Sequence, residues 1–114
     1  MTTFLEFHKY DGLGLAELVR TKQISPTELI EEAISRIEAH NPRINAVIYK
    51  MYAQARKAAQ GKLPDGPFMG VPFLLKDMHA TVVGVPMSCG TRMLKDIPQS
   101  RTTAKSYAAT GPRV

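Results

Sequence analysis

Lys76 is the side chain whose place in the sequence most favours a chemical role. It follows an apolar run, Val71–Leu75, in the stretch GVPFLLKD, and Asp77 comes directly after it. A short apolar run bounded by glycine and proline predicts a buried strand, and catalytic groups often lie where such a strand ends. Because removal from water disfavours an ammonium, a lysine there can become a neutral general base. The alternative is a surface lysine that marks the strand's exit into solvent, which this stretch alone favours.

Asp77 and Cys89 are the other side chains near Lys76 in the sequence that could take part in chemistry. Neighbours in a strand point to opposite faces, so we expect Asp77 to bind backbone N–H groups of the following turn rather than Lys76. A thiolate beside a histidine is a nucleophile, but nothing in the spacing brings Cys89 and His79 together. We therefore expect Cys89 to be a loop or packing residue.

No metal or cofactor is expected from the sequence. The three histidines are too dispersed to predict a metal site. The sequence also contains neither a Walker A loop nor a G-x-G-x-x-G motif, which would predict a nucleotide. Any chemistry is therefore expected to depend on protein side chains.

The composition is that of a small globular protein with a positive net charge. The 114 residues include 15 Lys and Arg and 10 Asp and Glu, which gives a net charge of +5. The basic residues are scattered and no base-stacking motif accompanies them, so we expect no nucleic-acid partner. No stretch approaches the ~20 apolar residues of a membrane span, so no membrane partner is expected. A single cysteine and an N-terminus without a signal-peptide core favour a cytoplasmic location.

Residues 11–60 predict a helical part that precedes the apolar run. Residues 1–10 are expected to form a loose or weakly docked N-terminal arm. Asp11 can cap a first helix that begins near Leu13. A further helix, from about 49 to 60, is expected after a short extended piece.

The second helix carries the strongest local signals. Ser25 and Glu28 are spaced as a capping box, and Pro26 occupies the first helical position, where no donor is lost. Asn41 and Pro42 are expected to end this helix.

Residues 61–114 predict a turn-rich loop, the strand that carries Lys76, a further loop and a terminal helix from Thr102 to Thr110. A weak strand at Thr81–Val83 is also possible by pattern. So few strands do not complete a sheet, so the 114 residues are interpreted as a single partial α/β domain. Open strand edges and an uncovered apolar face predict self-association, or pairing with a missing C-terminal portion.

Three stretches, in this order, resemble the N-terminal part of amidase signature family enzymes. They are LAELVRTKQISPTELIEEAISRIEAHNPRINAV, GPFMGVPFLLKD and GVPMSCGTRML. The resemblance runs from about Asp11 onward. It implies that the chain is the N-terminal fragment of an α/β/α fold, with helices followed by one to three strands of an incomplete mixed sheet.

The resemblance also implies an amide hydrolase with a Ser–cis-Ser–Lys triad. In such a triad one serine attacks the amide carbonyl, a second serine relays the proton, and a lysine is the base. By its position in the motif, Lys76 is that lysine. The family's two serines lie in a downstream glycine- and serine-rich loop that these 114 residues do not contain. Ser88 and Ser100 lack glycine-rich surroundings and are not expected to replace them.

These observations lead to two hypotheses. The first is a truncated N-terminal part of an amidase, which carries the base for a small amide substrate but is inactive alone. The second is a non-catalytic interaction module, derived from an amidase, that docks through its open sheet.

Overall fold

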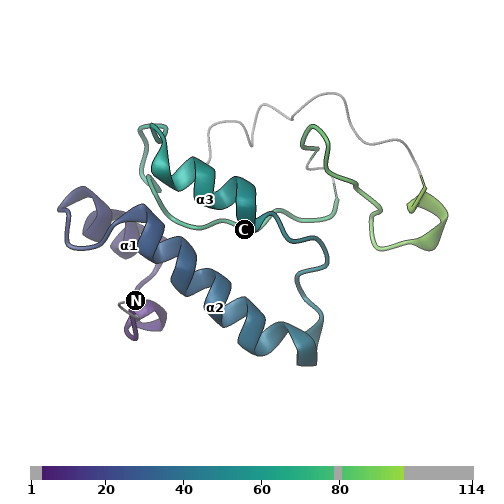
Figure 1. Ribbon diagram of the computed structural model, residues 1–114, viewed down its shortest axis with the longest axis horizontal. Coiled ribbons are helices and arrows are strands. Elements are labelled where there is room, and N and C mark those ends of the chain that lie inside the picture. Colours follow the sequence, from purple (N-terminus) through teal and green to yellow (C-terminus); the bar gives the residue numbers. More distant parts are fainter. Residues whose placement is uncertain (1–3, 79–80, 97–114) are drawn as a thin grey trace. The chain divides into compact units, whose positions relative to one another are not determined.

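The computed structural model describes residues 4–78 and 81–96 (Figure 1). The chain forms two compact units: the first holds the described residues up to Phe73, and the second those from Leu74 onward. The predicted terminal helix lies outside the described residues. Within those that are described, no helix has the length and hydropathy of a membrane span.

The first unit opens with a short segment that packs on the helices. Phe4 and Phe7 contact buried apolar side chains, and Phe7 begins a 3-10 helix, η1 (Phe7–Lys9). Helix α1 (Gly12–Arg20) follows, and the Asp11 carboxylate accepts the N–H of Gly14 at 2.8 Å. The predicted cap is confirmed, and the N-terminal segment is docked more firmly than its sequence indicates.

Helix α2 (Pro26–Ile44) begins with the predicted capping box. The Glu28 N–H donates to the Ser25 hydroxyl oxygen at 3.2 Å, and the Ser25 N–H donates to the Glu28 carboxylate at 2.8 Å. Two N–H groups that the first turn leaves without helical partners are satisfied in this way.

The prediction that Asn41 and Pro42 end α2 is wrong, because the helix continues to Ile44. Asn45 then adopts a left-handed conformation with φ of 47°, and its N–H donates to the Asn41 carbonyl at 2.7 Å. The Asn41 side chain also makes two bonds to the Val47 backbone, at 2.8 and 2.9 Å. These contacts hold the last turn closed although Pro42 offers no N–H.

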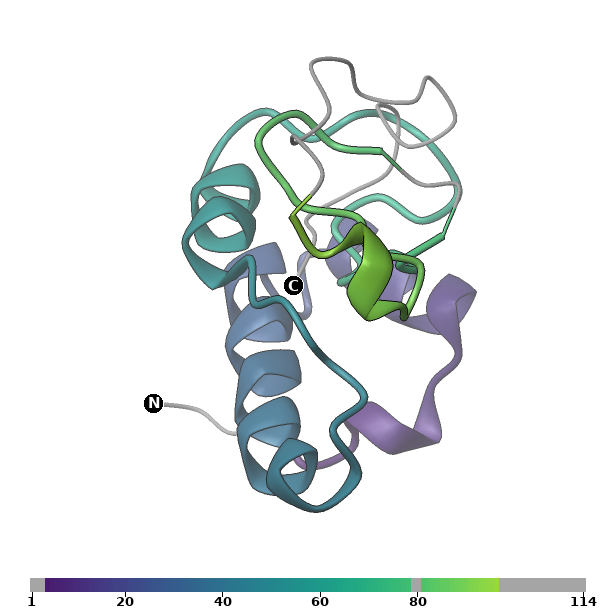
Figure 2. The same ribbon diagram turned by 90° about the vertical axis from the view of Figure 1, so that its right-hand side faces the viewer.

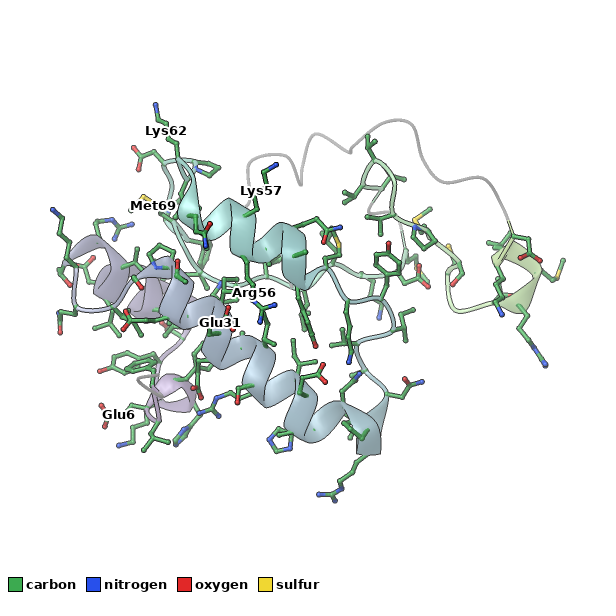
Figure 3. All side chains as sticks on the ribbon, in the orientation of Figure 1. Glu6, Glu31, Arg56, Lys57, Lys62 and Met69 are labelled. Atoms are coloured by element: carbon green, nitrogen blue, oxygen red, sulfur yellow. The ribbon has the colours of Figure 1, made fainter. Side chains whose placement is uncertain are left out.

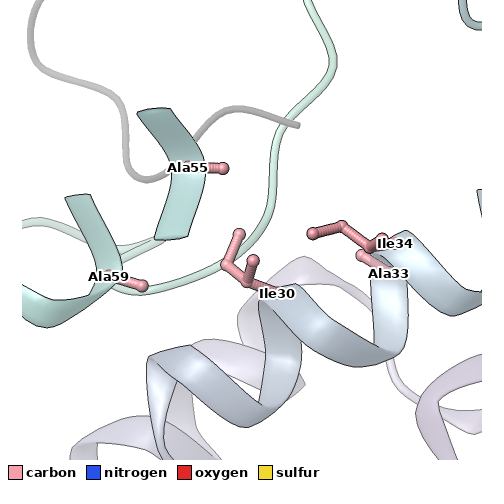
Figure 4. Packing of buried hydrophobic residues seen from close by; sticks show 5 residues of the cluster. All are labelled: Ile30, Ala33, Ile34, Ala55 and Ala59. Carbon is pink, nitrogen blue, oxygen red and sulfur yellow. The ribbon is translucent and has the colours of Figure 1, made fainter. Parts of the chain in front are cut away.

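Helix α3 (Tyr52–Gln60) begins three residues later than predicted and packs on α2, as Figure 2 shows from a second direction. Small side chains on α3 let the two helices approach closely. Figure 4 shows this cluster, whose buried members are Ile30, Ala33, Ile34, Ala55 and Ala59.

An ion pair joins the same two helices. The Arg56 guanidinium donates two hydrogen bonds to the Glu31 carboxylate, at 2.6 and 2.9 Å (Figure 3). Hydrogen bonding to Arg56 holds the pKa of Glu31 below its ordinary value, against a smaller opposing effect of partial burial. Apolar packing and this pair therefore fix α3 against α2.

A second cluster links the helices to the chain that leads to Lys76. Its buried members are Leu15, Val19, Ile24 and Leu29, and Met69 and Val71 pack against them. Gly70 is buried between these two residues with a φ of 79°, and a Cβ there would lie 3.0 Å from a methyl group of Val19 and 3.2 Å from Pro26. Only glycine fits this conformation and this close approach without strain.

The predicted strand at Val71–Leu75 is not formed in the structure. Phe73 makes a single β-bridge, and the described residues contain no strand. Thr81–Val83 is not a strand either, since the Val85 N–H donates to the Val82 carbonyl at 3.1 Å in a turn. A strand exists only as part of a hydrogen-bonded ladder, and residues 4–78 and 81–96 do not supply the neighbouring strands.

Candidate functional site

Lys76 lies in the second unit, and its side chain is exposed. It makes no hydrogen bond or ion pair with any residue in the described part of the chain. The expectation of partial burial at a strand end is therefore wrong for this structure. The reason is the missing ladder: the neighbouring Leu74 is 53% exposed rather than covered by a second layer.

Asp77, by contrast, is firmly bound. Its Oδ1 accepts the Ser88 N–H at 2.8 Å, and its Oδ2 accepts the Ser88 hydroxyl at 2.8 Å and the Gly90 N–H at 3.1 Å. The prediction that Asp77 binds backbone N–H groups is confirmed, but the donors lie 11 and 13 residues further on rather than in the turn that directly follows Asp77. Ser88 itself was missed as a partner, although a serine beside small residues is typical of such turns.

The hydrogen bonds also set the charge of Asp77. Partial burial raises the pKa of its carboxyl, but bonds from Ser88 and from the backbone N–H groups of the turn outweigh burial, and the pKa lies below the ordinary aspartate value. A carboxylate is an acceptor only, and it gains most from N–H and O–H donors while it is ionised. Asp77 is thus an anion held in place, which suits a structural role better than proton transfer.

Cys89 sits inside the turn of these donors, and the described residues of the same unit, 74–78 and 81–96, contain no histidine to activate its thiol. Its φ is 51°, in the left-handed region, and the side chain is partly buried. His79, the one histidine considered as its activator, lies outside the described residues. Within residues 4–78 and 81–96 no three His, Cys, Asp or Glu side chains form a group that could hold a metal ion.

The surroundings of Lys76 lack a core of their own. None of the described residues from Leu74 onward is buried. Their large apolar side chains are instead open to solvent: Leu74 is 53% exposed, Met78 42%, Val83 56% and Met93 89%. The candidate site is therefore Lys76 in a segment whose large apolar side chains are exposed, beside the hydrogen-bonded carboxylate of Asp77.

Comparison with known proteins shows where related segments occur. A family model described as Amidase matches residues 28–109, which include Lys76 and Asp77. The 6-aminohexanoate-cyclic-dimer hydrolase of Paenarthrobacter ureafaciens is 50% identical over 74 residues, which make up 65% of this chain and 15% of that protein. AmiC of Mycobacterium leprae, a protein assigned as an amidase, is 35% identical over 104 residues, with 90% of this chain and 22% of that protein covered.

The structure resembles the corresponding part of a bacterial aryl acylamidase that belongs to the amidase signature enzymes. The TM-score is 0.78 at 35% identity, and the match covers 92% of this chain and 24% of that one. The fold is thus that of the α/β amidase signature enzymes, although the described residues here are helical and contain no strand. The chain spans about a seventh to a quarter of the length of these relatives.

Proposed function

The chain belongs to the amidase family, and we propose that it supplies the N-terminal portion of a hydrolase of amide C–N bonds, with Lys76 as its general base. The observation that carries the proposal is the place of Lys76. It lies inside the family match, at the end of GVPFLLKD, the stretch that resembles the lysine segment of the amidase signature. As a neutral amine it would take a proton from the relay serine, while the nucleophilic serine attacks the amide carbonyl.

The two serines come, in this proposal, from polypeptide outside the 114 residues. The chain covers 15% of its 50% identical relative, so most of an amidase fold remains to be supplied. A general base typically contributes about 10²–10⁴ in rate, but only where a nucleophile is present. The 114 residues alone are therefore expected not to hydrolyse small amides.

The same missing polypeptide would complete the sheet. We propose that Val71–Leu75 becomes a strand of a mixed sheet once a neighbouring strand pairs with it. Covering Leu74 and the residues beside it would remove Lys76 from water, and a lysine amine acts as a base more readily when it is desolvated.

The second candidate function is a non-catalytic interaction module. The observation that favours it is the set of exposed apolar side chains in the second unit, such as Val83 and Met93. An uncovered apolar surface of this kind promotes association. Under both candidates the isolated chain is expected to self-associate, and sedimentation velocity would show species larger than a monomer. A monomer at all concentrations tested would contradict that expectation.

A fusion separates the two candidates. We would exchange the matching segment of the P. ureafaciens hydrolase for this chain and measure hydrolysis of the 6-aminohexanoate cyclic dimer. Activity of the fusion, with a loss of about a hundredfold or more in Lys76→Ala, supports the catalytic proposal. Lys62→Ala is the matched control, because Lys62 is an exposed lysine of the first unit. A fusion whose activity survives Lys76→Ala would favour the interaction module.

A further inference from the structure

Asp77 is next to Lys76 in the sequence, and both of its carboxylate oxygens accept hydrogen bonds from described residues. Oδ1 is bound by the Ser88 N–H at 2.8 Å. Oδ2 is bound by the Ser88 hydroxyl at 2.8 Å and by the Gly90 N–H at 3.1 Å. These three bonds connect positions that are 11 and 13 residues apart, so they hold Asp77 against a turn further along the second unit.

The turn that binds the carboxylate is itself closed. The Thr91 N–H donates to the Ser88 carbonyl at 3.0 Å. Cys89 and Gly90 both have positive φ, of 51° and 70°. Such consecutive turn residues direct their N–H groups to one side and form a concave anion site, and here the protein's own aspartate occupies it.

Lys76 has no comparable support. Its side chain is exposed and binds no described residue, and a lysine stem has four rotatable carbons. The direction in which it leaves the backbone is therefore set by the peptide that joins it to Asp77. A carboxylate fixed one residue away restricts that peptide, whereas the uncovered apolar side chains around it do not.

We infer that Asp77 is a positioning residue for Lys76, and that the turn of Ser88, Cys89 and Gly90 is the clamp through which it acts. The inference rests on the proposed role of Lys76 as the base. An aspartate suits the clamp because both carboxylate oxygens accept. An asparagine would present an NH₂ group to Gly90 and to the Ser88 hydroxyl, and would lose the charge-assisted bonds.

The clamp is tested first in the 114-residue chain. Amide exchange of Gly90, followed by NMR, is expected to become at least about tenfold faster in Asp77→Asn, since its N–H loses its acceptor. Exchange of Ser88 is expected to rise less, because the amide oxygen of the asparagine still accepts its N–H. Asp96→Asn is the matched control, because Asp96 is an exposed aspartate of the same unit. Unchanged exchange at both amides in Asp77→Asn would overturn the clamp.

The positioning role is tested in the fusion with the P. ureafaciens hydrolase. We expect Asp77→Asn to lower kcat by about ten- to a hundredfold with KM little changed, because a displaced base costs rate and not substrate affinity. Ser88→Ala is expected to lower kcat less. Ser88→Thr, which keeps the hydroxyl and the backbone N–H, is expected to retain most of the activity.

The outcomes distinguish this inference from the proposed function. Full activity in Lys76→Ala overturns the proposed function and the positioning role with it. Loss of activity in Lys76→Ala together with full activity in Asp77→Asn overturns the positioning role alone. A fall in kcat for Asp77→Asn and Ser88→Ala, with recovery in Ser88→Thr and no change in Asp96→Asn, supports it. A rise in KM of about ten- to a hundredfold in Asp77→Asn, with kcat unchanged, would also contradict the positioning role.

Discussion

The helices of the first unit and the segment around Lys76 are stabilised in different ways. Residues 12–60 form three helices that bury two apolar clusters, and the capping side chains of α1 and α2 lie within three residues of the N–H groups that they bind. The segment from Leu74 to Asp96 has no buried residue among those described, and its clearest fixed point is the Asp77 carboxylate. The part with the stronger packing holds no candidate catalytic group, and the part with the candidate base lacks packing.

This difference has a physical explanation in the range of the contacts. A capping box or an apolar helical face is satisfied by residues a few positions away, so a short chain can complete it. A sheet around a catalytic lysine needs strands from distant parts of a chain, and this chain spans 24% of the aryl acylamidase that it resembles. Stability should therefore be concentrated in the helices.

The largest expected effect comes from shortening one buried side chain of the helices, with an exposed side chain of the Lys76 segment as the comparison. Ile30 is fully buried against α3, so Ile30→Ala is expected to lower the free energy of unfolding by about 2–5 kcal/mol. Leu74→Ala removes a side chain of the Lys76 segment that is 53% exposed, and we expect a change within about 0.5 kcal/mol. Urea unfolding followed by circular dichroism measures both. Similar losses in the two variants would mean that the second unit has a core of its own.

Gly70 tests how tightly the helices pack on the chain segment that follows them in the first unit. A Cβ at Gly70 would meet Val19 at 3.0 Å, and its φ of 79° is strained for any other residue. Gly70→Ala is therefore expected to cost about 1–3 kcal/mol. Gly66→Ala is the control, since a Cβ there meets nothing within 4 Å. An equal effect of the two substitutions in thermal unfolding would show that residue 70 is not tightly packed.

The sequence predicts the local contacts of the helices better than the long-range contacts of the Lys76 segment. Ser25 and Glu28 were predictable as a capping box because both partners lie within one turn. Asn41 was expected to end α2, and the contacts that overturn this reach Val47, six residues on. The strand at Val71–Leu75 was expected from an apolar pattern that is correct only if neighbouring strands exist.

The candidate site divides in the same way. That Asp77 would accept backbone N–H groups was predictable, because short acidic side chains bind turns. That the donors would be Ser88 and Gly90 was not, since no local rule connects residues 11 and 13 positions apart. The apolar run before Lys76 made it a candidate base, but only the resemblance favoured that role over a surface lysine, and its exposure in this structure gives no sign of a role.

Acidification gives the smallest expected change in stability, and it should affect the two regions differently. The pKa values of Glu31 and Asp77 are both lowered in the folded chain. A lowered pKa stabilises the folded state above the ordinary pKa of the group, and this contribution is lost as pH falls through the lowered value. In the helices the loss affects the pair of Glu31 with Arg56 and the hydrogen bonds of Glu28 and Glu38, whose pKa values are also lowered. Burial of Ile30 does not depend on pH.

In the Lys76 segment the same loss removes the clamp. As pH falls, the NMR shifts of the Ser88 and Gly90 amides are expected to titrate with a midpoint below the ordinary aspartate value, while the amides of α3 stay protected. Arg56→Ala should raise the pKa of Glu31 and leave the titration of the Ser88 amide unchanged. Loss of both sets of protected amides in one step would mean that the two regions unfold together, and that the helices depend on the Lys76 segment after all.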